Sequence, residues 1–184
     1  GFEVMGCNDG FYIGAGNNTV TNCVIHDTHS IDPYATDWHN WSAGIIAAHS
    51  SNMLFHHNAI YNIGTGAGQV ACIMLQGSQN ARVYNNTLDN AGIGVWAFES
   101  SAGQRVINNT ITNMWQCGII DWGAVGSLTN QRNLFNANSA NYGGSASAGP
   151  GEFQGDPMFS GAPDYSLLAG SPAINTGIDL GLPF

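Results

Sequence analysis

The chain has 184 residues, of which 43% are hydrophobic and only 8% are charged. Twelve acidic residues stand against three arginines and no lysine, which gives a formal net charge of -9. Such a chain lacks the basic surface that neutralises phosphates, so nucleic acid and anionic membranes are excluded as partners. No apolar run reaches the roughly 18 residues of a transmembrane segment. The expected partners are neutral glycans, cations, or polyanions bridged by a cation.

A short motif recurs along the chain: an apolar residue, two further residues, an asparagine, one residue, and a second apolar residue. Its central slot falls at steps of 35, 28, 23 and 24 residues, on Cys23, Asn58, Asn86, Asn109 and Asn133. Asparagine tolerates left-handed turn conformations, and stacked asparagines form ladders of amide hydrogen bonds that satisfy buried backbone groups. The motif therefore indicates an asparagine ladder running through a stack of similar coils.

Each copy is accompanied by a second element, a small residue followed by apolar residues in period-two alternation. Its members begin at Gly10, Gly44, Cys72, Gly92 and Gly118. A coil of about 23 residues cannot bury its apolar face alone, whereas stacked coils bury a continuous core and pair each strand with its neighbours. We therefore predict an all-β fold, a right-handed parallel β-helix (a solenoid) of about five coils over residues 1–138. Residues 139–184 are expected to form a Gly/Ser-rich loop and an irregular closing tail of the same domain.

The longest insertion into the repeat, residues 26–43, carries a cluster of chemically active side chains. All six histidines lie between residues 26 and 57. Histidine titrates near neutral pH, and an adjacent aspartate can orient it for general acid or base catalysis. The candidate catalytic residues are His26, His29, Asp32 and His39. A purely structural loop with Asp-Pro turn chemistry is the alternative.

Three aspartates of the same insertion form a different candidate site. Asp27, Asp32 and Asp37 are candidate ligands for Ca²⁺, together with backbone carbonyl oxygens. Two tryptophans of the insertion, Trp38 and Trp41, offer rings that stack on sugar faces. No cofactor other than this candidate calcium ion is indicated.

Two further tryptophans occur at the same offset in the second element. Trp96 and Trp122 both follow the small residue by four positions, and Gln76 is their equivalent in the preceding coil. Strands of adjacent coils lie about 4.8 Å apart, so the two rings are expected to form an aromatic strip, as a carbohydrate platform or as packing beneath the tail. Glu99 and Asp121 lie near this strip and are candidates for substrate binding and for the carboxylate pair of a glycosidase.

The repeats resemble the parallel β-helix repeat family, whose founding members are pectate lyases. The tail is similar to a closing segment of secreted bacterial β-helix proteins, with Gly-Asp-Pro-Met-Phe at residues 155–159, Tyr-Ser-Leu at 165–167 and Gly-Ser-Pro-Ala-Ile at 170–174. This resemblance implies a secreted, extracellular or cell-surface protein whose tail closes the helix. It also implies that the chain is a segment of a longer protein.

The resemblance limits the chemistry as well. Lyases of this fold use a lysine or arginine base beside a uronate, and this chain has no lysine. The polygalacturonase-like hydrolases carry paired aspartates with Gly-His-Gly and Arg-Ile-Lys motifs, which do not occur here, and the epimerases carry Asp-Pro-His where this chain has Asp32-Pro33-Tyr34. Whether the chain is an enzyme stays open. If it is one, a carbohydrate-active hydrolase or epimerase is expected rather than a lysine-base lyase.

We interpret the chain as an extracellular β-helix module that binds or processes polysaccharide. The predicted contacts come from residues 26–41 and from the Trp96/Trp122 strip. The alternative is a structural or adhesive cell-surface module, or a filament-forming one, without enzymatic activity. Such a module would self-associate through the open ends of the helix, because an uncapped end offers unpaired strands to a neighbour.

Overall fold

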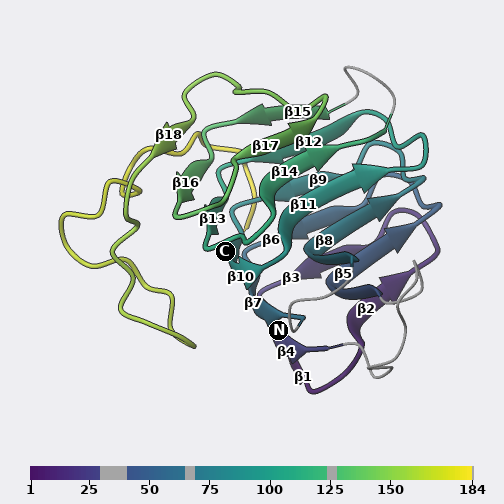
Figure 1. Cartoon of the computed structure of the whole chain (residues 1–184), viewed down its shortest axis with the longest axis horizontal. Coiled ribbons are helices and arrows are strands. Elements are labelled where there is room, and N and C mark those ends of the chain that lie inside the picture. The colour runs from purple at the N-terminus through teal and green to yellow at the C-terminus, as the bar shows by residue number, and fades with distance from the viewer. Residues whose placement is uncertain (30–40, 65–68, 124–127, 184) are drawn as a thin grey trace.

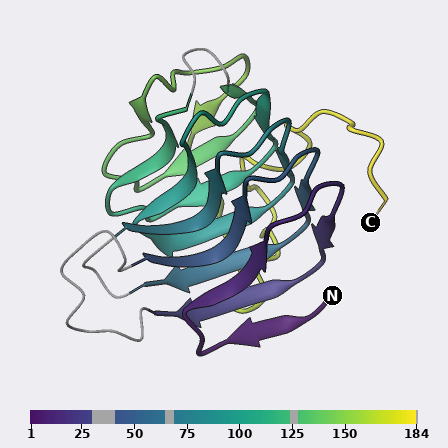
Figure 2. The same cartoon turned by 90° about the vertical axis from the view of Figure 1, so that its right-hand side faces the viewer.

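The computed structural model describes residues 1–29, 41–64, 69–123 and 128–183, and it shows a solenoid of short strands (Figure 1). The strands form three sheets of seven, six and five strands that extend along the stack. Each complete coil contributes one strand to each of the three sheets, and the strands are stacked parallel from coil to coil (Figure 2). The predicted all-β solenoid is confirmed.

The three sheets, named A, B and C, are built as follows. Sheet A consists of β1 (Glu3–Met5), β4 (Val24–Thr28), β7 (Ala59–Ile63), β10 (Thr87–Ala91), β13 (Thr110–Thr112), β16 (Leu134–Asn136) and β18 (Phe153–Gln154). Sheet B consists of β2 (Asp9–Ile13), β5 (Trp41–Ala48), β8 (Gln69–Gln76), β11 (Ile93–Phe98), β14 (Cys117–Asp121) and β17 (Tyr142–Gly144). Sheet C consists of β3 (Thr19–Thr21), β6 (Leu54–His56), β9 (Arg82–Tyr84), β12 (Gln104–Ile107) and β15 (Leu128–Gln131).

The asparagine ladder lies inside the turn between sheets C and A. Asn86 Oδ1 accepts hydrogen bonds from the backbone N–H of Asn58 at 3.1 Å and from its Nδ2 at 3.0 Å. Asn86 Nδ2 donates to Asn109 Oδ1 at 3.0 Å and to the carbonyl of Phe55 at 2.9 Å. Asn109 repeats this arrangement with Asn133. Because an unpaired buried amide costs about 1–3 kcal/mol, the ladder fixes one residue type at this slot.

Apolar side chains fill the space enclosed by the three sheets. One column on sheet A stacks, from coil to coil, Ile25, Ile60, Leu88, Ile111 and Phe135. All of these side chains are buried. Burial of each such side chain contributes about 1.5–3 kcal/mol, so the stack of coils, and no single coil, supplies the stability.

Sheet B corrects one detail of the predicted register. Gly94, and not Gly92, continues the column of small residues in this sheet. Trp96 and Trp122 are therefore offset along their strands, and the prediction that they share one register is wrong. In Gly-Ile-Gly-Val, both glycines are followed by an apolar residue, so either could be aligned with the small residue of the next coil. A pattern of period two looks the same after a shift of two residues.

Glu152 closes the C-terminal end of the asparagine ladder. Its carboxylate accepts hydrogen bonds from Asn133 Nδ2 at 2.7 Å and from Asn130 Nδ2 at 3.0 and 3.1 Å. It also accepts from the backbone N–H of Gly149 at 2.8 Å and from the hydroxyl of Tyr142. A carboxylate thus takes the place that the next asparagine of the ladder would occupy.

The tail after β18 runs back along the outside of the coils (Figure 1). Asn108 Nδ2 donates to the carbonyl of Ile178 at 2.8 Å, and Asn108 Oδ1 accepts from the N–H of Ile178 at 3.1 Å. The hydroxyl of Tyr165 donates to Asp89 Oδ2 at 2.9 Å. These contacts attach the tail at two separate points on the stack.

Candidate ligand-binding site on sheet B

The outer face of sheet B carries a second apolar cluster, separate from the core. Side chains alternate along a strand, so Val95 and Ala97 join the core while Trp96 and Phe98 face outward. The rings of Trp96 and Phe98 stack at 4.3 Å with 23° between their planes. Trp41, at the start of β5, packs edge-on against Trp96 at 6.2 Å and against Phe98 at 5.4 Å. The structure therefore gathers aromatic rings from coils that are distant in sequence.

Trp122 is the solvent-exposed member of this cluster. Its ring meets Trp96 edge-on at 5.5 Å and is 57% exposed, whereas Trp96 is only 2% exposed. The indole N–H groups of Trp41 and Trp96 are buried and have no hydrogen-bond partner among the described residues. An unpaired buried donor costs about 1–3 kcal/mol, so a ligand oxygen that reached these groups would relieve that cost. We call Trp41, Trp96, Phe98 and Trp122 the aromatic cluster.

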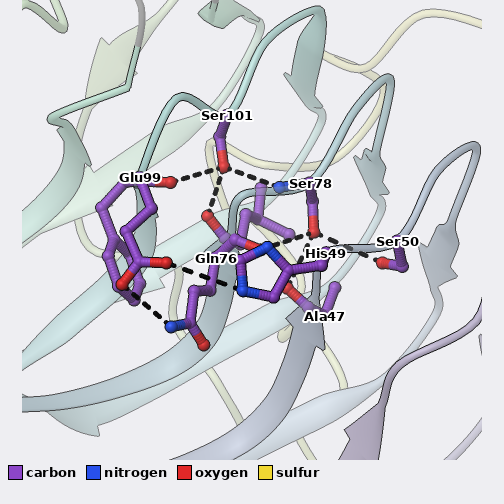
Figure 3. A network of polar contacts seen from close by, with 9 residues as sticks. Ala47, His49, Ser50, Gln76, Ser78, Glu99 and Ser101 are labelled. Atoms are coloured by element: carbon purple, nitrogen blue, oxygen red, sulfur yellow. Dashed lines mark hydrogen bonds and ion pairs between the residues drawn. The ribbon is translucent and has the colours of Figure 1, made fainter.

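Three polar side chains, those of His49, Gln76 and Glu99, lie together at the end of sheet B (Figure 3). Gln76 Nε2 donates to Glu99 Oε1 at 2.9 Å, and Glu99 Oε2 lies 3.8 Å from His49 Nε2. The side chains of His49 and Glu99 are 70% and 46% exposed. Gln76 pairs in register with Phe98, which places its amide in the same outward column as the cluster. We call His49, Gln76 and Glu99 the polar row.

The turn that presents the polar row has left-handed backbone at the same point of three coils. The angle φ is 46° at His49, 56° at Gly77 and 54° at Glu99. A Cβ atom on Gly77 would lie 2.5 Å from Nδ1 of His49, so the imidazole rests directly over the glycine. Left-handed backbone is uncommon for histidine and glutamate, but it recurs at other turns of the solenoid, such as Asn52 and Asn80, so it belongs to the coil geometry.

A ladder of buried serines supports this turn from the inside (Figure 3). The N–H of Ser78 donates to Ser101 Oγ at 3.0 Å, and Ser78 Oγ donates to the carbonyl of Ala47 at 2.7 Å. Ser50 Oγ lies 3.3 Å from Ser78 Oγ. All three serines are buried. Because the turn is hydrogen-bonded from beneath, the polar row sits on a rigid base rather than on a free loop.

His26, a predicted catalytic residue, lies in a different network on sheet A. Its Nδ1 is 2.7 Å from Asp27 Oδ2, its Nε2 is 3.2 Å from Glu3 Oε1, and its ring stacks on Tyr61 at 4.8 Å. Burial lowers the pKa of His26, but the hydrogen bonds to Asp27 and Glu3 outweigh this effect and raise the pKa above 6.5. The hydrogen bond with His26 is also the main reason why the pKa of Asp27 is lowered.

The tail contacts this sheet A network at Tyr61. The ring of Tyr165 lies 5.2 Å from that of Tyr61, and its hydroxyl donates to Asp89. Asp89 also accepts a hydrogen bond from Thr112 Oγ1 at 2.7 Å. Burial raises the pKa of Tyr165, and the negative charge of Asp89 raises it further. Because His26 is only 7% exposed, these contacts describe a tail-attachment site better than an open cleft.

The remaining predicted residues of the 26–43 insertion are only partly described. His29 Nδ1 lies 3.3 Å from the carbonyl of Asp27. Four predicted residues lie outside the described ranges, and their roles stay predictions: Asp32, Asp37, Trp38 and His39. Within the described ranges, no group of three or more His, Cys, Asp or Glu side chains is placed to hold a metal ion.

Asp121 and Glu99 are not brought together as a facing carboxylate pair. Asp121 pairs in register with the inward-facing Ala97 and is only 2% exposed. Its carboxylate accepts hydrogen bonds from the N–H of Gly123 at 3.0 Å and from Ser145 Oγ at 2.9 Å. Glu99 instead bonds the outward-facing Gln76, so Asp121 closes the core while Glu99 belongs to the surface.

Comparison with protein families agrees with this architecture. The family described as the right handed beta helix region matches residues 3–141. The chain belongs to this family. The aromatic cluster and the polar row of this right-handed β-helix protein lie wholly within the matched segment. No curated protein matches the chain. Among the described residues, no helix has the length and apolar character needed to cross a membrane.

Proposed function

We propose that this right-handed β-helix protein is an extracellular module that binds polysaccharide on the outer face of sheet B. The contact surface is the aromatic cluster together with the polar row. The observation that carries the proposal is the exposed side chain of Trp122, which continues a cluster with two buried indole N–H donors that have no partner in the described part of the chain. A sugar presents both an apolar ring face and hydroxyl groups, and this surface offers a partner for each.

The chemistry of the polar row supports a hydroxyl-rich ligand. A carboxylate accepts strong hydrogen bonds, an amide both donates and accepts, and an imidazole does either according to its tautomer. Glu99, Gln76 and His49 supply these three groups within one row. The low charge of the chain suits a neutral ligand at this face, because Glu99 would repel a second carboxylate.

Affinity electrophoresis against a panel of neutral and acidic polysaccharides tests the proposal. We expect retardation by at least one neutral polysaccharide, and we expect Trp122→Ala to weaken it about tenfold or more, as for an aromatic hot spot. Trp115→Ala is the matched control, because it removes another surface indole, 36% exposed, outside the aromatic cluster. The proposal fails if no polysaccharide retards the protein, or if both variants lose retardation equally.

A further inference from the structure

Two of the three arginines of the chain stand side by side on the outer face of sheet C. Arg82 in β9 pairs in register with Arg105 in β12. The residues that follow them, Val83 and Val106, belong to the buried core, so the two arginines point outward from adjacent coils. Both are exposed. Adjacent strands lie about 4.8 Å apart, which brings two positive charges within reach of one small ligand.

The register neighbours do not neutralise this pair. The same column continues to Leu54 beside Arg82 and to Thr129 beside Arg105. The ion pairs found among the described residues all involve histidine, although the chain has twelve acidic residues. Like charges directly opposite each other on neighbouring strands destabilise a sheet. A chain with a net charge of -9 thus keeps two of its three cations together, and neither forms an ion pair with a carboxylate of the described residues.

The charges of the two arginines act on one point, next to Tyr84. Tyr84 lies on β9 two residues after Arg82 and is only 4% exposed. Burial raises the pKa of Tyr84, while the positive charges of Arg105 and Arg82 both lower it. Side chains alternate along a strand, so Tyr84 and the register pair Arg82 and Arg105 lie on the same face of sheet C.

We propose that Arg82 and Arg105 form an oxyanion-binding site, which takes a carboxylate or sulfate group. A guanidinium presents planar, paired donors that match the geometry of such groups, and hydrogen bonds between ionised partners are the stronger ones. A bound oxyanion also removes the repulsion between the two arginines. This site lies on sheet C, away from the sheet B surface, and it does not rest on the proposed function.

The small number of arginines makes the test direct. With three arginines in the chain, a ¹H–¹⁵N spectrum of the guanidinium Nε–Hε groups holds three signals, assigned by substituting each arginine in turn. Inorganic sulfate is titrated against chloride at constant ionic strength. We expect saturable shifts of the Arg82 and Arg105 signals, with Arg132 as the internal control. Equal shifts of all three signals, or none, would overturn the proposal.

Two variants separate the pair from a general effect of charge. The double variant Arg82→Gln, Arg105→Gln should weaken sulfate binding by about tenfold or more, whereas Arg132→Gln should change it less than about twofold. An equal loss of sulfate binding in both variants would contradict a site at the pair.

Repeating the titration with a uronic acid oligosaccharide and with a neutral oligosaccharide of equal length identifies the source of the oxyanion. Tighter binding of the uronic acid oligomer than of sulfate points to an acidic glycan, and tighter binding of sulfate points to a free anion. A neutral oligomer that shifts the same two signals would contradict an oxyanion site.

Discussion

The outer faces of sheets A and B carry the same types of residue in different surroundings. Each places a histidine beside a carboxylate: His26 with Asp27 on sheet A, and His49 with Glu99 at the end of sheet B. The side chain of His26 is 9% exposed, whereas that of His49 is 70% exposed. His26 stacks on Tyr61 and contacts the carboxylates of Asp27 and Glu3, and the tail residue Tyr165 packs on the same Tyr61. Residue types alone therefore do not identify the ligand-binding face, because the packing around each histidine decides how far it is exposed.

The two faces are therefore expected to have different roles. On sheet A, the ring contact between Tyr165 and Tyr61 and the hydrogen bond from Tyr165 to Asp89 attach the tail, so changes there should affect stability. On sheet B, the exposed ring of Trp122 and the polar row face the solvent, so changes there should affect ligand binding. The predictions below begin with the interior that supports both faces.

Asn86→Ala should cause the largest loss. It leaves partners on both sides of the ladder unpaired, including the N–H of Asn58 and the carbonyl of Phe55. We expect the free energy of unfolding in urea to fall by about 3 kcal/mol, with both faces affected. Asn136→Ala, a half-buried position at the end of β16, is the control and should cost less than about 1 kcal/mol. A similar fall in the free energy of unfolding in the two variants would show that the ladder stabilises the fold no more than an ordinary asparagine.

Tyr165→Phe tests the sheet A face alone. It removes the hydroxyl that donates to Asp89 and keeps the ring against Tyr61. A hydrogen bond to a charged group is worth about 1.5–3 kcal/mol, so we expect a loss near the lower figure, because Thr112 still donates to Asp89. Polysaccharide retardation should not change. Loss of retardation in this variant would show that the tail contact on sheet A also contributes to polysaccharide binding.

The pH dependence of stability should also separate the faces. The pKa of His26 is raised in the folded state, so its contribution is fully present below 6.5 and is lost as the pH rises through the raised value. The lowered pKa of Asp27 adds stability above 3.8 that is lost only in more acidic solution. Urea unfolding at about pH 6 and about pH 9 should show a loss in the wild type that His26→Gln reduces. An identical pH profile in the two proteins would show that His26 does not cause the pH dependence of stability.

His49→Ala should have the smallest effect on stability. The ion pair with Glu99 is exposed at 3.8 Å, and exposed pairs contribute between 0 and about 1 kcal/mol. We expect unfolding to change by less than about 0.5 kcal/mol and polysaccharide retardation to weaken about threefold, through loss of one hydrogen-bonding group. A large destabilisation would show that the polar row is structural.

The repeat could be predicted from the sequence because one physical requirement recurs in every coil. The ladder at Asn58, Asn86, Asn109 and Asn133 needs the same amide each time, so the pattern is visible without a structure. Glu152 could not be predicted, because it closes the ladder only once. The register of Trp96 and Trp122 was wrong because alternation alone allows a shift of two residues.

The candidate site was predicted only in part. Of the residues in the proposed site, Trp41, Trp96, Trp122 and Glu99 were predicted from the sequence, whereas His49 and Phe98 were not, and Gln76 was noted only as the equivalent of the tryptophans in the preceding coil. A signal for these three residues does exist, because each lies at or just beyond the end of a sheet B strand, as Glu99 does. The contact of Tyr165 with Tyr61 could not be predicted, since it depends on where the tail packs. No local pattern encodes a contact between segments so far apart.

The indole N–H groups offer the most direct test of ligand binding on sheet B. The chain has five tryptophans, and substituting each in turn assigns its ¹H–¹⁵N indole signal. Titration with the polysaccharide that retards the protein, as a soluble oligosaccharide, should shift the signals of Trp41, Trp96 and Trp122 and leave Trp115 unchanged. If the signals of the aromatic cluster stay fixed while the oligosaccharide binds, the ligand lies elsewhere and the account of sheet B is contradicted.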